Sequence, residues 1–409
     1  MDDSHLINYA KLIAKVGLNV QKGQDVMLSC GFDQPRFIHM LVKELYECGA
    51  RKVFVTYNDS ELTKLDIQYQ NVDDLSKVET FDKDKQEYIA DHYACRLFIE
   101  SEDPDALKGI DFKKYSKAMQ ARRKVFEPIR DRYDNYVQWC IAGVPSLGWA
   151  KKVFPELDGD EAIEALRKAI LEVSRAWDGD PIKNWEEHDN NLAKKKDKLN
   201  AMHLEKLVYK SKNGTDFTVH MIPDCLWAAG GEYGQTSRIY FQPNIPSEEC
   251  FTSPMKGKCE GVVYSSKPLS YNSNIIEDFS IRFENGKVSE IHAKKGEEFL
   301  KELVKMDEGS AMLGECALIP FHSPINDTKL IFFSTLYDEN AACHLALGCG
   351  FENLIVGYEK MTLEEVRAKG INNSMSHVDF MIGSEDLDVV GYDKDGNKYQ
   401  IFKNGDWAF

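Results

Sequence analysis

His377 and Asp379 lie two residues apart in an apolar stretch, with Val378 between them. In an extended segment, residues i and i+2 point to the same face, so the imidazole and the carboxylate can bind the same ion. A histidine that pairs with a surface aspartate is the alternative explanation, and the triplet alone does not decide between them.

His344 follows two acidic residues, Asp338 and Glu339, in a run of small and apolar residues. A carboxylate packed among apolar neighbours needs a partner, because an unpaired buried charge costs free energy. A metal ion is one such partner, and a helix N-cap role for Asp338 is the other.

Two further segments hold carboxylates in unusual surroundings. Glu315 lies within an apolar run that we expect to form a strand, so it must be paired, protonated or bound to a metal. Glu248 and Glu249 lie in a loop between Pro246 and Pro254, whose rings restrict the backbone and favour a fixed carboxylate.

All of these candidates follow residue 244, and together they predict a metal centre. Carboxylate oxygens and imidazole nitrogens suit Zn, Co, Mn or Mg, and such mixed sets often hold two ions about 3.5–4 Å apart. A pair of ions polarises a carbonyl and generates hydroxide near neutral pH, and the hydrolysis of an amide needs both effects.

The cysteines next to these candidates suggest a rival thiolate zinc site. Cys250, Cys316 and Cys343 each adjoin a proposed ligand or lie one residue from it. However, neighbours in an extended segment point to opposite faces, and the cysteine spacing is not typical of zinc sites. The sequence therefore favours the carboxylate and imidazole set.

The periodicity of apolar residues along the sequence predicts two domains of the α/β class. In residues 1–200, helical periodicity alternates with apolar strand signals, which predicts an N-terminal domain with a parallel sheet and helices. From residue 201 to 409, strand-like alternation dominates, and Asn285-Gly286 is typical of a hairpin turn. We expect this second half to be a strand-rich α+β catalytic domain that binds the metal. The strands expected in the first half are 26–28, 52–57, 96–99 and 137–144.

The composition disfavours several partners. The formal net charge of −16 repels phosphate backbones, so we expect no nucleic-acid partner. No run approaches the roughly 18 apolar residues that span a bilayer, so we expect no membrane association. The ten scattered cysteines contain no CxxC pair, which favours a reduced, cytoplasmic location. Two basic clusters, Arg122-Arg123-Lys124 and Lys194-Lys195-Lys196, are expected to be solvated helix faces.

Five blocks of the second half carry a family resemblance. The blocks are 244–254, 313–315, 323–325, 338–348 and 376–383. In order and approximate spacing they resemble the thermophilic-aminopeptidase family of metalloexopeptidases, the group of aminopeptidases T, S and II. The total length and the α/β first half are also similar to that family.

The resemblance implies a metal-dependent aminopeptidase. It implies hydrolysis of the N-terminal bond of short peptides with a free N-terminus, by a water that two divalent ions activate. It also implies a homodimer whose internal cavity restricts the substrates to short or unfolded peptides. Glu248 is our candidate for the general base that handles the proton of the attacking water. Glu315 is the expected bridge between the ions. The ligands implied by position are Glu249, Glu315, Glu339, His344, His377 and Asp379.

One position departs from the family pattern. Seven residues after His344, the family carries a tyrosine, and this chain has Phe351. Loss of that hydroxyl affects turnover and substrate preference more than metal binding, since every implied ligand is retained. Two alternatives stay open: another dinuclear metallohydrolase, such as a phosphohydrolase, or an inactive relative that binds peptide or metal. The ligand segments contain no lysine or arginine to hold a phosphate, which disfavours the phosphohydrolase.

Overall fold

The computed structural model describes residues 3–235, 237–271 and 273–409. The chain forms two compact units. The first contains the residues up to Glu187 together with 231–246, and the second contains 188–230 and 247–409. The sequence predicted a single boundary near residue 200 and did not predict that residues 231–246 belong to the first unit.

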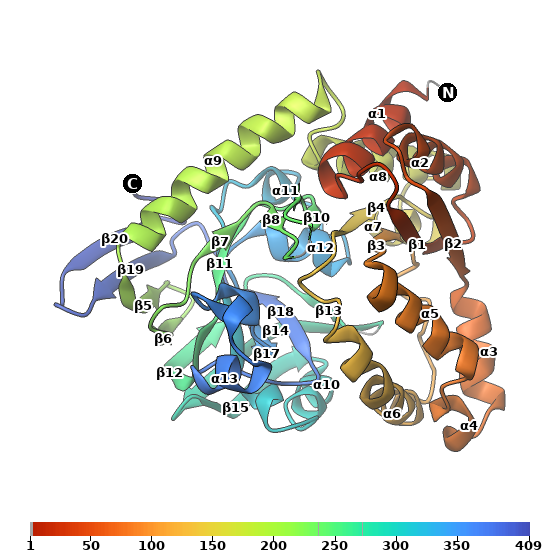
Figure 1. Cartoon of the computed structure of the whole chain (residues 1–409). Helices are drawn as coiled ribbons and strands as arrows, with labels where there is room; N and C mark the ends of the chain where they lie inside the picture. Colours follow the sequence, from red (N-terminus) through yellow and green to blue (C-terminus); the bar gives the residue numbers. More distant parts are fainter. Residues whose placement is uncertain (1–2, 236, 272) are drawn as a thin grey trace. The chain divides into compact units, whose positions relative to one another are not determined.

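The first unit is built on a five-stranded parallel sheet with the order β10-β4-β3-β1-β2 (Figure 1). The strands are β1 (Asp25–Gly31), β2 (Lys52–Asn58), β3 (Cys95–Glu100), β4 (Trp139–Gly143) and β10 (Asn244–Ile245). Val26, Leu28 and Leu97 are buried in its centre, as expected for parallel strands that helices cover. The prediction of a parallel sheet with helices is therefore confirmed.

The helices of this unit connect the strands. They are α1 (Ser4–Leu12), α2 (Pro35–Glu47), α3 (Ser60–Tyr69), α4 (Val72–Ser76), α5 (Thr80–His92), α6 (Phe112–Arg130), α7 (Leu147–Val153) and α8 (Gly159–Val173). A small two-stranded sheet, β8 (Glu232–Tyr233) with β9 (Tyr240–Phe241), precedes β10. On α6 the basic cluster only partly matches the expectation of a solvated face, because Lys124 is exposed but Arg122 and Arg123 are half buried.

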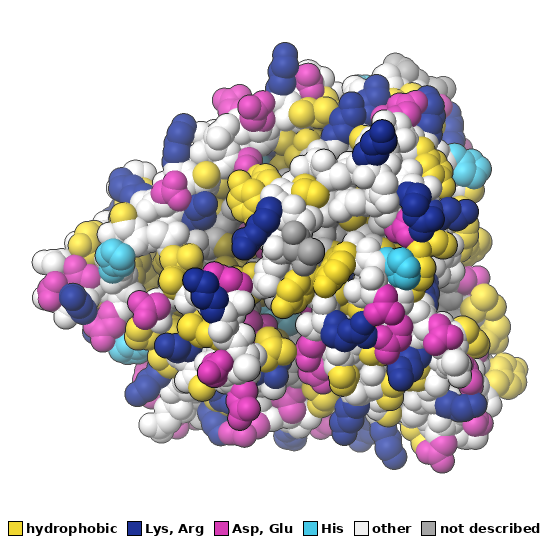
Figure 2. Space-filling model, viewed as in Figure 1, with side chains coloured by type: hydrophobic (Ala, Val, Ile, Leu, Met, Phe, Trp, Pro, Cys, Tyr) yellow, Lys and Arg dark blue, Asp and Glu magenta, His cyan; other side chains and the backbone are white. Residues whose placement is uncertain are grey.

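Helix α9 (Pro181–Ala201) begins in the first unit and continues into the second. Trp185, Leu192 and Leu199 recur every seven residues and form its buried stripe. Figure 2 shows basic and acidic side chains mixed along the outside of this helix. Lys194 is exposed, as expected for a solvated face, and Lys195 covers the ring of Trp407 at 4.6 Å. Within the described residues, no helix has both the length and the apolar character that crossing a membrane requires.

The second unit contains two antiparallel sheets. The larger has the order β13-β14-β12-β6-β5-β19-β20-β21, with β15 paired to β14. Its strands are β5 (Leu204–Lys210), β6 (Asp216–Met221), β12 (Pro254–Tyr264), β13 (Leu269–Tyr271), β14 (Asn274–Glu284), β15 (Lys287–Lys295), β19 (Asp388–Asp393), β20 (Lys398–Lys403) and β21 (Asp406–Trp407). The hairpin predicted at Asn285-Gly286 joins β14 to β15, and both residues have a positive φ, as this turn requires.

The smaller sheet has the order β18-β17-β16-β11-β7 and is central to the site. Its strands are β7 (Ala228–Ala229), β11 (Cys250–Thr252), β16 (Leu313–Leu318), β17 (His344–Gly348) and β18 (His377–Met381). The hydrophobic core draws residues from both sheets, and Phe279 of β14 contacts Phe380 of β18 with ring centroids 6.0 Å apart. Short helices lie in the connections: α10 (Glu297–Leu303), α11 (Pro324–Asp327), α12 (Thr335–Asp338) and α13 (Leu363–Ala368).

Candidate metal centre

The register of the smaller sheet brings the sequence-predicted residues to one face. On β17, His344, Ala346 and Gly348 alternate along the strand and therefore share a face. Ala346 lies opposite Glu315 of β16 on one side and opposite Asp379 of β18 on the other. His377, two residues before Asp379, lies opposite Gly348.

A bulge in β16 orients Glu315. The pairing with β17 shifts between Leu313 and Glu315, so Gly314 is an extra residue in the strand. A Cβ atom on Gly314 would lie 2.1 Å from the carbonyl oxygen of Cys349, so only glycine fits there. Bulges of this kind re-aim the neighbouring side chain, here the glutamate at the centre of the site.

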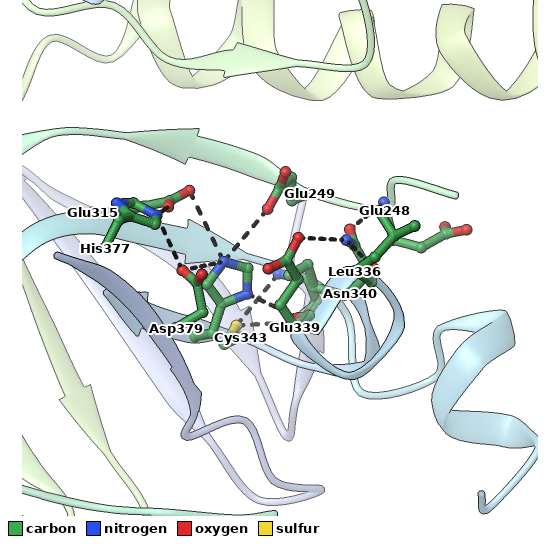
Figure 3. A network of polar contacts seen from close by, with 11 residues as sticks. Glu248, Glu249, Glu315, Leu336, Glu339, Asn340, Cys343, His377 and Asp379 are labelled. Atoms are coloured by element: carbon green, nitrogen blue, oxygen red, sulfur yellow. Dashed lines mark hydrogen bonds and ion pairs between the residues drawn. The ribbon is translucent and has the colours of Figure 1, made fainter. Parts of the chain in front are cut away.

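The candidate ligand atoms form two groups that share Glu315. The groups are Glu249 with Glu315 and His344, and Glu315 with His377 and Asp379; within each, the ligand atoms lie within 4.8 Å of one another. Glu315 Oε1 lies 3.9 Å from His344 Nε2, whereas Oε2 lies 3.1 Å from His377 Nε2. Glu315 therefore presents one oxygen to each histidine, which is the arrangement of a bridging carboxylate. Figure 3 shows these carboxylates turned toward one another.

Further contacts tie the two groups into one cluster. His344 Nε2 lies 3.4 Å from Glu249 Oε2 and 3.8 Å from Asp379 Oδ1. The same Asp379 oxygen lies 3.4 Å from His377 Nε2. Asp379 Oδ1 is buried and forms no hydrogen bond with the described residues, so it has a lone pair available for a cation.

Backbone carbonyls fix the orientation of both imidazoles. His344 Nδ1 donates to the carbonyl oxygen of Glu339 at 2.8 Å, and His377 Nδ1 donates to that of Cys349 at 2.7 Å. Because a carbonyl can only accept, each ring carries its proton on Nδ1 and can present a free Nε2 to a metal ion. This outer contact is typical of metal-binding histidines.

Burial and mutual repulsion perturb the acid–base properties of the site. Burial, followed by the charge of Glu315, raises the pKa of Glu249 to about 8. Burial lowers the pKa of His344, but its contacts with Glu315 and Asp379 outweigh this and raise it to about 9. Burial likewise raises the pKa of Asp379, and the neighbouring His377 outweighs it and lowers that pKa to about 2. Such displaced pKa values are typical of functional sites.

Exposure differs among the candidate ligands and defines an open side. The side chain of His377 is 30% exposed, whereas those of Glu315 and Asp379 are 4% and 7% exposed. The cluster is therefore most exposed on the side of His377.

Glu339 and Glu248 lie at different places relative to the cluster. The carboxylate of Glu339 is turned toward the cluster in Figure 3, and its oxygen accepts a hydrogen bond from Asn340. Partial burial and the charges of Asp379 and Glu249 raise the pKa of Glu339 well above its usual value. Glu339 borders the two groups of ligand atoms but belongs to neither.

The Glu248 carboxylate points away from the cluster, and its role as the general base stays a prediction. Figure 3 shows the side chain directed away from Glu249. Its Oε2 lies 3.8 Å from His188 Nε2, and its backbone N–H donates to Asn340 Oδ1.

Asp338 is partnered by the chain itself rather than by the cluster. Its carboxylate accepts the backbone N–H of Phe332 at 2.8 Å, and those of Phe333 and Ser334 as well. Asp338 thus holds the loop that precedes α12, and its side chain makes no cap hydrogen bond to the helical turn that follows it. The sequence did not predict a role for Asn340, whose side-chain amide joins Glu339 to the backbone of Glu248.

The cysteines do not take part in the cluster. Burial raises the pKa of both Cys250 and Cys343 to about 12, so these thiols stay protonated at neutral pH. Within the described residues, neither group of candidate ligands includes a cysteine.

Phe351 lies beside the open edge of the cluster. Its ring centroid is 5.2 Å from that of His377 and 5.1 Å from that of Phe251. Its backbone N–H donates to Ser253 Oγ. The position that departs from the family pattern is therefore in contact with a candidate ligand.

Comparisons with known proteins match the chain over nearly its whole length. Residues 2–407 match the family model described as thermophilic metalloprotease (M29). Aminopeptidase AmpS of Bacillus subtilis is 41% identical over 405 residues, which cover 99% of this chain and 98% of the relative. Aminopeptidase T of Thermus thermophilus is 36% identical over 405 residues, with the same coverage of both chains. A solved structure of AmpT from Thermus thermophilus superposes with a TM-score of 0.90 at 35% identity and covers 99% of both chains.

Proposed function

Because the chain belongs to the thermophilic metalloprotease family M29, it is an aminopeptidase, and we propose that it uses two divalent ions to remove N-terminal residues from short peptides. The observation that carries the proposal is the shared carboxylate of Glu315, which presents a separate oxygen to His344 and to His377.

The charges of the cluster favour cations. Three buried carboxylates and the partly buried Glu339 face two imidazoles, so a negative surplus remains even when both imidazoles are protonated. Such a surplus in a buried place costs free energy unless protons or cations compensate it. Two observations reflect this cost. The pKa of Glu249 is raised, and the buried Oδ1 of Asp379 has no hydrogen-bond partner among the described residues.

The residues that fit two ions divide around Glu315. Glu249 and His344 would hold one ion with Glu315, and His377 and Asp379 would hold the other, with Glu339 as a further ligand. These oxygen and nitrogen donors suit Zn, Co, Mn or Mg. When bound, such ions polarise the scissile carbonyl and lower the pKa of water.

The chain's own groups supply orientation and selectivity. The two Nδ1 contacts keep each Nε2 directed into the cluster before substrate arrives, which removes a reorganisation step from the reaction. The formal net charge of −16 attracts the cationic α-amine of a peptide, and this amine is what distinguishes an N-terminus from the rest of a chain.

We also propose a cytoplasmic homodimer. All ten cysteines are free thiols, which suits a reducing compartment. Near the edge strand β2, Tyr57, Leu62 and Tyr69 expose 48%, 60% and 77% of their surface, and apolar exposure of this kind is common where subunits associate. Light scattering of the purified protein would give the mass of a monomer if the dimer proposal is wrong.

Release of free amino acids from dipeptides, with N-acetylated dipeptides as the blocked control, tests the function. We expect a chelator to abolish release and added cobalt, zinc or manganese to restore it, with two ions bound per chain by elemental analysis. Glu315→Ala and His377→Ala should abolish release, whereas Glu298→Ala, which alters an exposed glutamate, should not. Full activity of both site variants, or cleavage of the acetylated peptides at the same rate, would overturn the proposal.

A further inference from the structure

A polar network lies at one end of the three strands that carry most of the candidate ligands. β16 begins, β17 ends and β18 begins at this end, because neighbouring strands of this sheet are antiparallel. The network lies in the second unit, and its centre is a carboxylate that precedes β16. Its members, which are separate from the candidate ligands, are Asp307, Ser310, Asn372, Ser374 and Ser376.

The Asp307 carboxylate is surrounded by hydrogen-bond donors. Its Oδ1 accepts the backbone N–H and the hydroxyl of Ser310 at 2.9 and 3.0 Å, and the hydroxyl of Ser374 at 2.9 Å. Its Oδ2 accepts the backbone N–H of Met375 at 2.6 Å. Burial raises the pKa of Asp307, but these hydrogen bonds outweigh burial and lower that pKa. The carboxylate is therefore ionised at neutral pH.

The contacts at this position require a carboxylate rather than any polar group. An amide of the same shape has one oxygen and one NH2 group, so one of the two acceptor positions would become a donor. At Oδ1 that donor would face the N–H of Ser310, and at Oδ2 it would face the N–H of Met375. An asparagine at position 307 therefore loses a backbone contact in either orientation.

The ionised carboxylate also sets the direction of a ring of hydroxyls. Ser310 and Ser374 each direct their single proton to Asp307, and the Ser376 hydroxyl donates to Ser310 Oγ at 3.0 Å. Ser374 Oγ in turn accepts the backbone N–H of Ser376 at 3.1 Å. All three serines are buried. Because a fully satisfied buried network is rigid, the segment 374–376 is held in one conformation.

This segment leads directly into His377, the first residue of β18. The carbonyl oxygen of Ser376 accepts the N–H of Cys349 at 2.7 Å, and the carbonyl oxygen of Cys349 accepts Nδ1–H of His377 at 2.7 Å. Asn372 strengthens the same end of the sheet, because its amide donates to carbonyl oxygens on the segments that precede β16 and end β17. A displacement of Ser376 therefore disturbs the contact that orients the imidazole.

His377 depends on this support more than the other candidate imidazole does. β18 is an edge strand of the smaller sheet, so the backbone of His377 has a strand on one side only. His344 lies on the inner strand β17, with β16 and β18 on its two sides. The side chain of His377 is 30% exposed, whereas that of His344 is 1% exposed. Packing alone therefore fixes His377 less firmly.

We infer that Asp307 is a positioning residue for His377: through the buried serines, its carboxylate holds the imidazole where it can bind the ion expected at Glu315, His377 and Asp379. This inference rests on the proposed function, because it concerns one of the two proposed ions. Outer contacts of this kind tune metal affinity by about 10- to 100-fold. The other proposed ion has no ligand on the segment 374–377, so its affinity should stay nearly unchanged.

Titration of the chelated protein with zinc tests the inference without relying on activity. Competition with a chromophoric chelator measures the two affinities, and elemental analysis after dialysis counts the ions retained. We expect the unmodified chain to bind two ions. Asp307→Asn should bind one ion with unchanged affinity and the other about tenfold more weakly or worse. Release of amino acids from dipeptides by this variant should recover as the metal concentration is raised, which requires a folded chain.

Three further variants separate positioning from a general loss of stability. Glu308→Gln changes the adjacent carboxylate, which is exposed, and should bind both ions like the unmodified chain. Val219→Ala opens a cavity in the larger sheet and destabilises the same unit, yet it should keep both affinities. Ser374→Ala removes only one hydroxyl of the network and should weaken the same ion as Asp307→Asn does. It provides the test if Asp307→Asn does not fold.

The outcomes distinguish this inference from the proposed function. If the unmodified chain binds fewer than two ions, the proposed function fails and the inference fails with it. If that chain binds two ions, and Asp307→Asn and Ser374→Ala bind both with unchanged affinity, the inference is wrong and the proposed function stands. Equal weakening of both ions, or the same selective weakening in Val219→Ala, would also overturn the inference, because a loss of stability would then explain the result.

Discussion

Glu315 and Asp379 lie opposite the same residue, Ala346, from the strands on its two sides. Neighbouring strands are about 4.8 Å apart, so the backbones that carry the two carboxylates are separated by roughly 10 Å. The two side chains extend toward each other above the methyl group of Ala346. A larger side chain at position 346 would occupy the space in which the ligand atoms converge. The small residues of this segment therefore have a direct consequence for metal binding.

We predict that Ala346→Leu lowers metal content and activity together, by about 10- to 100-fold in activity, because the ligands are displaced. Overpacking at this fully buried position should also cost about 1–3 kcal/mol of stability. Ala346→Gly leaves the space open and is the matched control, which should keep both ions at some cost in stability. Elemental analysis and dipeptide hydrolysis measure both effects, and a Leu variant that keeps two ions would contradict the prediction.

The roles of Glu248 and Glu339 can be separated by amide substitutions. Glu339→Gln should lower the turnover of dipeptides strongly, because this side chain faces the cluster. Glu248→Gln should keep most of the activity, because the carboxylate lies next to His188 instead. Turnover measured at saturating metal distinguishes the two variants. A collapse of activity in Glu248→Gln with normal metal content would instead support Glu248 as the general base.

The sequence predicted the segments that form the cluster but not every side-chain direction. Glu315 was recognisable because a charge within an apolar strand requires a partner. Glu248 and Glu249 lie in a loop without strand periodicity, so the sequence could not predict that their carboxylates point in different directions. By contrast, no local sequence pattern predicts β10. A two-residue strand is too short to show periodicity, and its partner β4 lies about a hundred residues earlier in the chain.

The arginines of α6 show the same limit of sequence patterns. Arg122 and Arg123 are adjacent to Lys124 in a mixed-charge helix, and this composition is typical of a solvated face. Which side of a helix faces its neighbours depends on how the helix packs. Only the fold reveals that two of these three cations line a cavity.

Phe351 allows a test of the missing hydroxyl. Its ring contacts that of His377, so a tyrosine at this position would bring a phenolic donor to the open edge of the cluster. We predict that Phe351→Tyr raises kcat and leaves the metal content unchanged, because a fixed donor near the scissile carbonyl stabilises the developing negative charge. Phe351→Leu is the control, since it removes the ring contact with Phe251 without adding a donor. A kcat of the Tyr variant at or below that of the unmodified chain would contradict the prediction.

The pKa shifts predict that the folding stability of the metal-free protein and that of the metal-loaded protein change in opposite directions with pH. Without metal, the folded chain raises the pKa of Glu249 from 4.5 to about 8, mainly through burial. Against the effect of burial, contacts with carboxylates raise the pKa of His344 from 6.5 to about 9. The folded state then holds protons that the unfolded chain has released, so its stability falls as the pH rises through this range. The lowered pKa of Asp379 contributes stability that is constant above about pH 5, so it does not alter the slope in this range.

Bound metal reverses this slope, because the ligands must lose their protons and metal affinity rises with pH. We therefore expect the stability of the metal-free protein to fall by at least about 1 kcal/mol between pH 6.5 and pH 9, while the metal-loaded protein gains relative to it. Thermal unfolding of chelated and metal-loaded samples across this range measures the gap. Glu249→Gln should flatten the metal-free curve, because its amide does not titrate. Parallel curves for the two forms would show that these groups do not exchange protons for metal.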